Sequence, residues 1–194
     1  MRARLEDAAV ELFHRKGFMA TSVREVTSAV GVTVGALYNH FPSKEALLHA
    51  IISKAHSDLL RQLRAAVEGV DRPAEALREF VETYVLFYTR FPRESRVSVR
   101  DMEFLPPGDL EQIAEARRAT RRLLQDVLEQ GVEVGEFALL DSADMPPQRA
   151  TAMAIMDMCV MVTEPYWLQA SLSPRRIADL HVQLALRMVG VVDR

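Results

Sequence analysis

The sequence has few of the residues that build covalent frameworks or disordered chains. Cys159 is its one cysteine, which excludes a disulfide framework and a cysteine-rich zinc site. Eight glycines and nine prolines in 194 residues are too few for a collagen-like or low-complexity protein. The longest apolar stretch, residues 152–162, contains Asp157 and is too short to cross a bilayer. We therefore expect a reduced, cytoplasmic protein that makes no membrane contact.

Excess charge and catalytic motifs are missing as well. The formal net charge is −3, so any binding of nucleic acid must be local rather than a property of the whole chain. Residues 1–50 carry six Lys/Arg and five Asp/Glu, against 18 and 22 in the remainder. The five histidines lack metal-ligand spacing, and no phosphate-binding glycine loop or nucleophile elbow occurs. We predict a protein that is not an enzyme and uses no metal or cofactor.

Helical periodicity runs through the whole chain. A first helix ending at Gly17 has one apolar face, made of Leu5, Ala8, Ala9, Leu12 and Phe13. Ser22 and Glu25 form a capping box that opens a second helix, and Gly31 ends it. Later helices are expected at about 33–39, 44–68, 73–91, 93–104, 109–130, 146–165 and 174–190. No sustained run has a period of two, so the prediction is an all-α fold of about nine helices.

The second and third predicted helices are short and are joined by a tight turn at Gly31. This arrangement is a helix-turn-helix, in which the second helix lies in the major groove of DNA and the first crosses the backbone. We predict a DNA-binding domain over residues 1–50, with the motif at about 22–41. Residues 51–194 remain for a second, C-terminal domain.

Several side chains of this region suit contacts with DNA. We expect contacts from Ser22, Arg24, Thr33, Val34, Gly35, Ala36, Tyr38, His40 and Lys44. Tyr38 and His40 can donate hydrogen bonds to phosphate, and Lys44 adds a charge at a helix start. The recognition helix has no Arg, Asn or Gln, so Thr33, Val34 and Ala36 are expected to contact thymine methyl groups. Arg24 is then the best candidate for a contact to guanine or phosphate. Arg2 and Arg4 are either a minor-groove arm or solvated charges.

One pattern of residues spans the first quarter of the chain. It consists of Ala9, Phe13, Gly17-Phe18, Thr21-Ser22-Val23-Arg24, Gly31-Val32, Gly35-Ala36-Leu37-Tyr38, His40-Phe41, Ser43-Lys44-Glu45 and Leu47-Leu48. In this pattern the sequence resembles the TetR-type (tetracycline-repressor-like) transcriptional regulators. The resemblance implies a helical homodimer that binds a palindromic double-stranded DNA operator. It also implies that residues 51–194 form a ligand-binding and dimerisation domain. A small-molecule effector in its pocket would move the two DNA-binding domains and release the DNA.

The C-terminal part offers residues for a pocket and for a dimer seam. The candidates for the pocket are Tyr84, Phe87, Tyr88, Phe104, Met153, Met156, Asp157 and Trp167. A buried Asp157 would need a cation, a ligand or the seam as a partner. The last helix has two apolar stripes, which indicates burial on both sides. The expected seam residues are Met158, Met161, Ile177, Leu180, Leu184 and Met188. For most of the pocket candidates, an ordinary place in the core is the favoured explanation.

These features predict a DNA-binding transcriptional regulator. We expect a repressor whose effector is hydrophobic, for example an acyl-CoA, a fatty acid or an aromatic compound. The alternatives are an activator or global regulator, or an all-α module that binds protein. We expect the arginines at 117–122 to lie on a solvated helix face. The alternative is that they bind an anionic effector. A steep salt dependence of duplex binding would separate a DNA reader from a protein-binding module.

Overall fold

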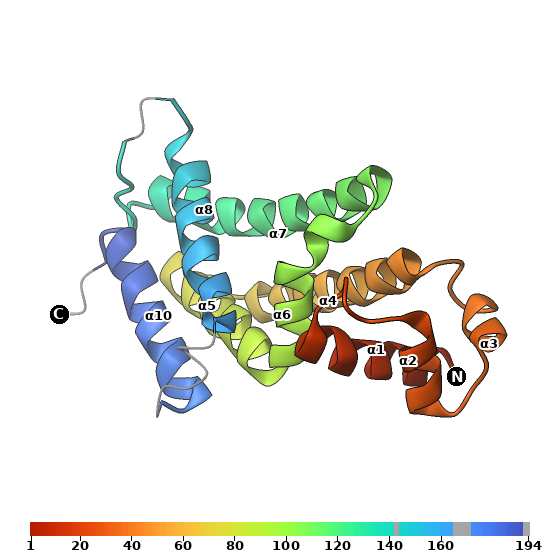
Figure 1. The fold of residues 1–194 in the computed structure, drawn as a ribbon. Helices are drawn as coiled ribbons and strands as arrows, with labels where there is room; N and C mark the ends of the chain where they lie inside the picture. The colour runs from red at the N-terminus through yellow and green to blue at the C-terminus, as the bar shows by residue number, and fades with distance from the viewer. Residues whose placement is uncertain (142–143, 165–171, 192–194) are drawn as a thin grey trace. The chain divides into compact units, whose positions relative to one another are not determined.

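The computed structural model describes residues 1–141, 144–164 and 172–191. Within these residues the chain forms nine α-helices and two short 3₁₀ helices, and no strand (Figure 1). This confirms the predicted all-α class and the helix count. No helix in the described part of the chain is long and apolar enough to span a membrane. One pocket candidate, Trp167, lies outside the described residues.

The chain divides into two compact units. The first unit contains residues 1–57 and 91–116, and the second unit contains residues 58–90 and 117–194. The first unit therefore extends beyond the predicted domain of residues 1–50. Residues 91–116 belong to it because the sixth helix packs against the first. Packing between segments so far apart in sequence leaves no mark in the local composition.

The first unit is built from α1 (Arg2–Lys16), α2 (Val23–Val30), α3 (Val34–Tyr38), α6 (Pro92–Arg100) and η1 (Met102–Phe104), with the first parts of α4 (Lys44–Val67) and α7 (Pro107–Glu133). Its core consists of large apolar side chains from several of these elements. The largest are Leu5, Phe13, Phe18, Leu37, Phe41, Leu47, Leu48, Ile52 and Ile113. Near the predicted helix-turn-helix, Val26, Leu37 and Phe41 are buried, whereas Val30 and Val32 are half-buried.

An arginine of α6 holds the C-terminal end of α1. The Arg100 Nη2 group donates a hydrogen bond to the Phe13 carbonyl at 2.6 Å. Its guanidinium also pairs with both carboxylate oxygens of Asp101, at 2.7 and 2.8 Å. Asp101 is 1% exposed, so Arg100 neutralises a charge that burial would otherwise penalise. This link fastens α6 to α1 inside the first unit.

His14 lies near the same end of α1, among guanidinium groups. Burial lowers the pKa of His14 below its usual 6.5, and the charges of Arg96, Arg100 and Arg93 lower it further, while Glu11 acts in the opposite direction. The folded first unit therefore favours the neutral imidazole.

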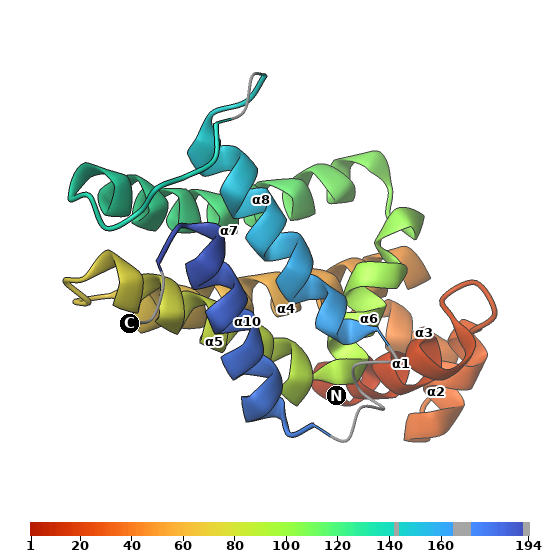
Figure 2. The same ribbon diagram turned by 90° about the vertical axis from the view of Figure 1, so that its left-hand side faces the viewer.

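The second unit consists of α5 (Pro73–Arg90), α8 (Pro147–Val160), η2 (Met161–Thr163) and α10 (Pro174–Met188), with the later parts of α4 and α7. Helix α10 packs along α5, and α8 packs against both (Figure 2). The core contains Leu77, Phe80, Val81, Val85, Leu124, Leu128, Ile155, Val182 and Leu186. Helix α7 continues to Glu133 instead of ending at 130, because Gly131 remains helical beneath the ring of Phe137.

Candidate nucleic-acid interface

The predicted helix-turn-helix forms in the first unit, and local hydrogen bonds explain why. The Ser22 hydroxyl accepts a hydrogen bond from the Glu25 N–H at 3.2 Å, and Glu25 accepts one from the Ser22 N–H at 2.8 Å. This is the predicted capping box at the start of α2. Gly31 then adopts φ 71° and ψ 37°, a left-handed conformation that suits glycine. The Val32 N–H donates to a carbonyl of α2 at 3.0 Å and closes the turn.

Helix α3, the predicted recognition helix, is short and has one anchored side. Thr33 caps it, accepting a hydrogen bond from the Ala36 N–H at 3.2 Å. Leu37 is fully buried and holds the helix on the core of the first unit. Val34 and Ala36 are half-buried, whereas Thr33 and Gly35 are exposed. The accessible surface at the start of α3, residues 33–36, therefore carries only short side chains.

Three polar residues of this region are exposed, and their side chains lack hydrogen-bond and ion-pair partners in the described part of the chain. Tyr38 is 50% exposed, and Arg24 and His40 are also exposed. Within the described part of the chain, none of the three makes a side-chain hydrogen bond or an ion pair. Exposed donors of this kind can bind phosphate or base edges without first losing an internal bond.

Three other predicted DNA contacts already serve the fold. The Ser22 hydroxyl donates to Glu25 at 2.9 Å as well as capping α2. Thr33 caps α3. The Lys44 ammonium donates to two backbone carbonyls of the first unit, and its side chain is only half-exposed. Any DNA contact from these residues has to accommodate or break such bonds.

Charged residues around the motif are largely paired. Lys16 donates to Glu25, and this hydrogen bond, followed by those from Ser22, lowers the pKa of Glu25 to about 2. Arg4 donates to the Val30 carbonyl at 3.1 Å, at the end of α2. Arg2 lies in the first turn of α1 and pairs with Glu6 at 3.1 Å. Both arginines considered for a minor-groove arm are thus parts of α1 with partners of their own.

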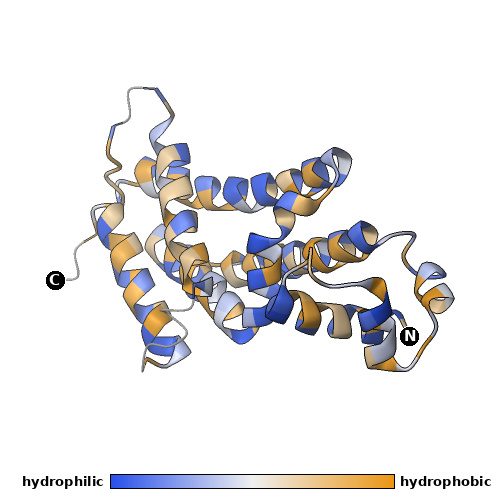
Figure 3. Cartoon of the chain, in the orientation of Figure 1, coloured by the Kyte–Doolittle hydropathy of each residue, from blue (hydrophilic) through white to orange (hydrophobic). Residues whose placement is uncertain are grey.

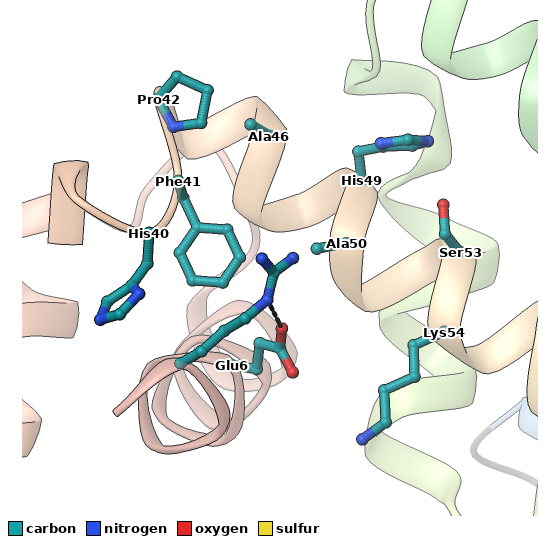
Figure 4. A pocket seen from close by; sticks show the side chains of 10 residues that line it. Glu6, His40, Phe41, Pro42, Ala46, His49, Ala50, Ser53 and Lys54 are labelled. Atoms are coloured by element: carbon teal, nitrogen blue, oxygen red, sulfur yellow. Dashed lines mark hydrogen bonds and ion pairs between the residues drawn. The ribbon is translucent and has the colours of Figure 1, made fainter.

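A groove of about 580 Å³ lies beside His40 in the first unit (Figure 4). Its walls come from the start of α1, the α3–α4 connection and one side of α4. The lining residues are Arg2, Glu6, His40, Phe41, Pro42, Ala46, His49, Ala50, Ser53 and Lys54. The Arg2 guanidinium carbon lies 4.6 Å from the centroid of the Phe41 ring, and His49 is 3.7 Å from Asp109. His40 therefore lies at the border of a groove that is lined by both apolar and charged residues.

The predicted pocket residues do not gather at one place. Phe104 lies in the first unit, where its ring stacks on Phe18 at 5.5 Å. Met153 and Asp157 are exposed on α8, and Met156 is half-buried. In the single chain Asp157 is exposed, because positions 153 and 157 share the outer face of α8. The buried face of α8 consists instead of Ala152, Ile155 and Cys159.

Tyr84, Phe87 and Tyr88 of α5 are buried in the second unit. The rings of Tyr84 and Tyr88 stack with centroids 5.1 Å apart. Burial raises the pKa of both hydroxyls, and the Arg117 charge lowers both slightly. Burial likewise raises the pKa of the neighbouring Cys159 thiol, which favours an inert thiol over a reactive thiolate. These residues form a buried cluster of aromatic rings with polar ends.

Large apolar side chains are exposed on α8, η2 and α10, where Figure 3 shows hydrophobic residues interspersed with hydrophilic ones. The exposed fractions are 37% for Met153, 45% for Met161, 39% for Leu180 and 38% for Leu184. Met158 and Met188 are half-buried. Ile177, also expected at the seam, is 3% exposed and belongs to the core of the second unit. Of the two stripes on α10, one thus packs on its own chain and much of the other faces outward.

Comparison with known proteins now identifies the fold. The family model described as bacterial regulatory proteins of the tetR family matches residues 5–51, and the Tetracyclin repressor-like C-terminal domain matches residues 70–189. The chain belongs to the TetR family. It is thus a DNA-binding regulator from a family of transcriptional regulators rather than enzymes. Among the described residues, no group of three or more His, Cys, Asp or Glu side chains is placed to hold a metal ion.

Individual relatives agree with this assignment. The transcriptional repressor KstR2 of Rhodococcus jostii is 31% identical over 138 residues, which are 70% of this chain and 67% of KstR2. A TetR-family regulatory protein from Rhodococcus RHA1 has a solved structure with a TM-score of 0.91 and 32% identity, covering 99% of this chain and 98% of that one. AibR, solved with isovaleryl coenzyme A and operator DNA, shares the fold with a TM-score of 0.81 at 24% identity, over 94% of this chain and 96% of AibR.

Proposed function

We propose that this TetR-family regulator is a homodimeric repressor, which binds a palindromic operator and is released from it by a small hydrophobic effector. The observation that carries the proposal is the helix-turn-helix with three exposed, unpaired polar side chains, Arg24, Tyr38 and His40. Arg24 reads guanine or binds phosphate, and Tyr38 and His40 bind phosphate. Val34 and Ala36 then contact thymine methyl groups, which favours A·T pairs beneath α3.

The proposal of a dimer rests on the apolar side chains exposed by the second unit. Met161 lies on η2, Leu180 and Leu184 lie on α10, and both of these elements pack against α8. Exposed apolar surface of this kind typically marks an interface. Two copies joined through α8 and α10 present two helix-turn-helix motifs, and a two-fold dimer matches a palindromic site.

The proposal of a hydrophobic effector rests on the buried aromatic cluster of α5. Tyr84, Phe87 and Tyr88 supply apolar surface together with hydroxyl groups that can orient a ligand. The charge of Arg117 lowers the pKa of both tyrosine hydroxyls, against the larger effect of burial, and this exposed guanidinium is a candidate partner for an anionic head group. AibR, which shares the fold, was solved with isovaleryl coenzyme A, so acyl-CoA thioesters are the first effectors to test. Fatty acids and aromatic compounds are the next classes.

Selection of bound duplexes from a random library tests the DNA-binding part of the proposal. We expect a palindrome to be enriched, with A·T pairs at the positions beneath α3. Acyl-CoA thioesters, fatty acids and aromatic compounds are then added to the bound probe, and one of these classes is expected to release it. Transcription in vitro from a promoter overlapping the site should fall when the protein is added. An asymmetric motif would contradict the two-fold dimer, and increased transcription would identify an activator.

A further inference from the structure

Lys44, the first residue of α4, reaches back to the α1–α2 turn, which is residues 17–22. Its Nζ atom donates hydrogen bonds to the Phe18 carbonyl at 2.9 Å and to the Thr21 carbonyl at 3.0 Å. The same atom lies 4.1 Å from the centroid of the Phe18 ring. This is within the distance at which an ammonium is attracted to an aromatic face. The Lys44 ammonium thus contacts two carbonyl oxygens and one aromatic ring of the same turn.

The α1–α2 turn is rigid where the ammonium contacts it. The Thr21 side chain is 1% exposed, its hydroxyl donates to the Gly17 carbonyl at 2.9 Å, and its N–H donates to the Phe18 carbonyl at 3.2 Å. The Phe18 ring is buried between neighbours, with centroids 5.3 Å from Phe13 and 5.5 Å from Phe104. Both carbonyls that accept from the ammonium are therefore held in place by buried side chains.

This contact joins the two ends of the helix-turn-helix. Thr21 directly precedes Ser22, the cap of α2, and Lys44 follows the last residues of the motif. Everything that the proposed function assigns to DNA recognition, from Arg24 to His40, lies between the two joined positions. The contact therefore helps to fix the distance between the start of α2 and the start of α4.

We infer that Lys44 is a positioning residue for operator binding, which holds the α1–α2 turn against α4. The inference rests on the proposed operator binding. Two of the three ammonium donors are taken by carbonyls of the turn, so the side chain acts on operator binding through the turn that it holds. Arginine cannot take its place, because a planar guanidinium does not present a compact charge to two carbonyls and a ring at once. Methionine keeps an unbranched apolar stem and removes the charge.

The test compares wild type with Lys44→Met and Lys44→Arg, and uses Lys54→Met as the matched control. Lys54 is an exposed lysine of the same helix, with no side-chain hydrogen bond or ion pair in the described part of the chain. Affinity for a duplex selected by the wild type is measured from 50 to 300 mM salt, at a temperature where circular dichroism finds every variant folded. Hydrogen exchange of the Thr21 amide is measured in the free proteins. Exchange of α10 amides serves as the internal reference.

We expect Lys44→Met and Lys44→Arg each to weaken duplex binding by about tenfold or more. The Thr21 amide should exchange about tenfold faster in both Lys44 variants, with α10 unchanged. A lysine that acts only as a phosphate ligand would instead lower the salt slope of Lys44→Met, relative to that of Lys54→Met, by about 0.9 for each phosphate no longer neutralised, and would leave Lys44→Arg with wild-type affinity and Thr21 exchange unchanged. Wild-type affinity of Lys44→Arg overturns the inference, and so does unchanged Thr21 exchange, which is read without DNA. Failure of the wild type to bind any duplex would refute the proposed function separately.

Discussion

The ring of Phe137 packs directly on the backbone of Gly131 in α7, which makes Gly131→Ala a sharp test of the second unit. A Cβ atom at Gly131 would lie 1.9 Å from Cδ2, 2.3 Å from Cε2 and 2.5 Å from Cγ of Phe137. Rotation of the ring cannot relieve the contact with Cγ, so the whole side chain must move. Phe137 is 5% exposed, and its N–H donates to the Gly131 carbonyl at 2.9 Å, which ties its backbone to the site.

The expected change in stability is a balance of two opposing effects. Exposing the Phe137 ring costs roughly 1.5–3 kcal/mol. Alanine in a helix interior gains about 1 kcal/mol over glycine. Gly131→Ala should therefore lower the free energy of unfolding by roughly 0.5–2 kcal/mol, the difference between these two contributions. In a Phe137→Ala background the clash is absent, and the same change should stabilise the protein by roughly 0.5–1 kcal/mol.

Urea denaturation of the wild type, both single variants and the double variant measures this double-mutant cycle. The prediction is a change of sign for Gly131→Ala between the two backgrounds. If Gly131→Ala is stabilising in the presence of Phe137, or has the same effect in both backgrounds, the packing of this ring on α7 is refuted.

Three further predictions concern other parts of the chain. Because the pKa of His14 is lowered from 6.5, the unfolded chain binds the proton more readily, so stability should fall as the pH drops through 6.5. His14→Gln should reduce the difference in melting temperature between pH 7.5 and 5.5, and an unchanged difference would show that another group is responsible. Arg100→Met leaves the Asp101 carboxylate without its guanidinium and should lower the free energy of unfolding by about 2–3 kcal/mol, with partial recovery in the double variant Arg100→Met/Asp101→Asn. Calorimetry checks both steps, and equal melting temperatures for Arg100→Met and the wild type would argue against the link between α6 and α1. Leu184→Glu places a charge on the proposed seam and should give a folded monomer in sedimentation velocity, whereas a persisting dimer would place the interface elsewhere.

The helix-turn-helix is predictable from the sequence because its determinants are local. The capping box of Ser22 and Glu25 and the left-handed Gly31 need only residues within a few positions of each other. The same holds for helices that begin with proline, such as α5 and α10. The structure confirms each of these features.

Features that depend on packing between distant segments are not predictable in this way. Residue type groups Phe104 with the aromatic residues of α5, but Phe104 stacks on Phe18 in the first unit. The apolar neighbours of Asp157 in the sequence do not show which face of α8 this side chain occupies, and in the single chain it lies on the exposed face. No local pattern indicates that the Lys44 ammonium meets the Phe18 and Thr21 carbonyls, since the two sides are more than twenty residues apart.

The central claim is that this regulator binds DNA through the exposed polar residues of its helix-turn-helix. The most direct test is the affinity of the triple variant Arg24→Met/Tyr38→Phe/His40→Gln for the duplex that the wild type selects. These side chains support no internal hydrogen bond in the described structure, so the variant should melt at the wild-type temperature. The dimer of the variant loses six side-chain contacts to DNA, and each contact contributes about 1 kcal/mol to the free energy of binding. The affinity for the duplex should therefore fall by at least about a hundredfold. A folded triple variant that binds this duplex as tightly as the wild type would contradict the claim.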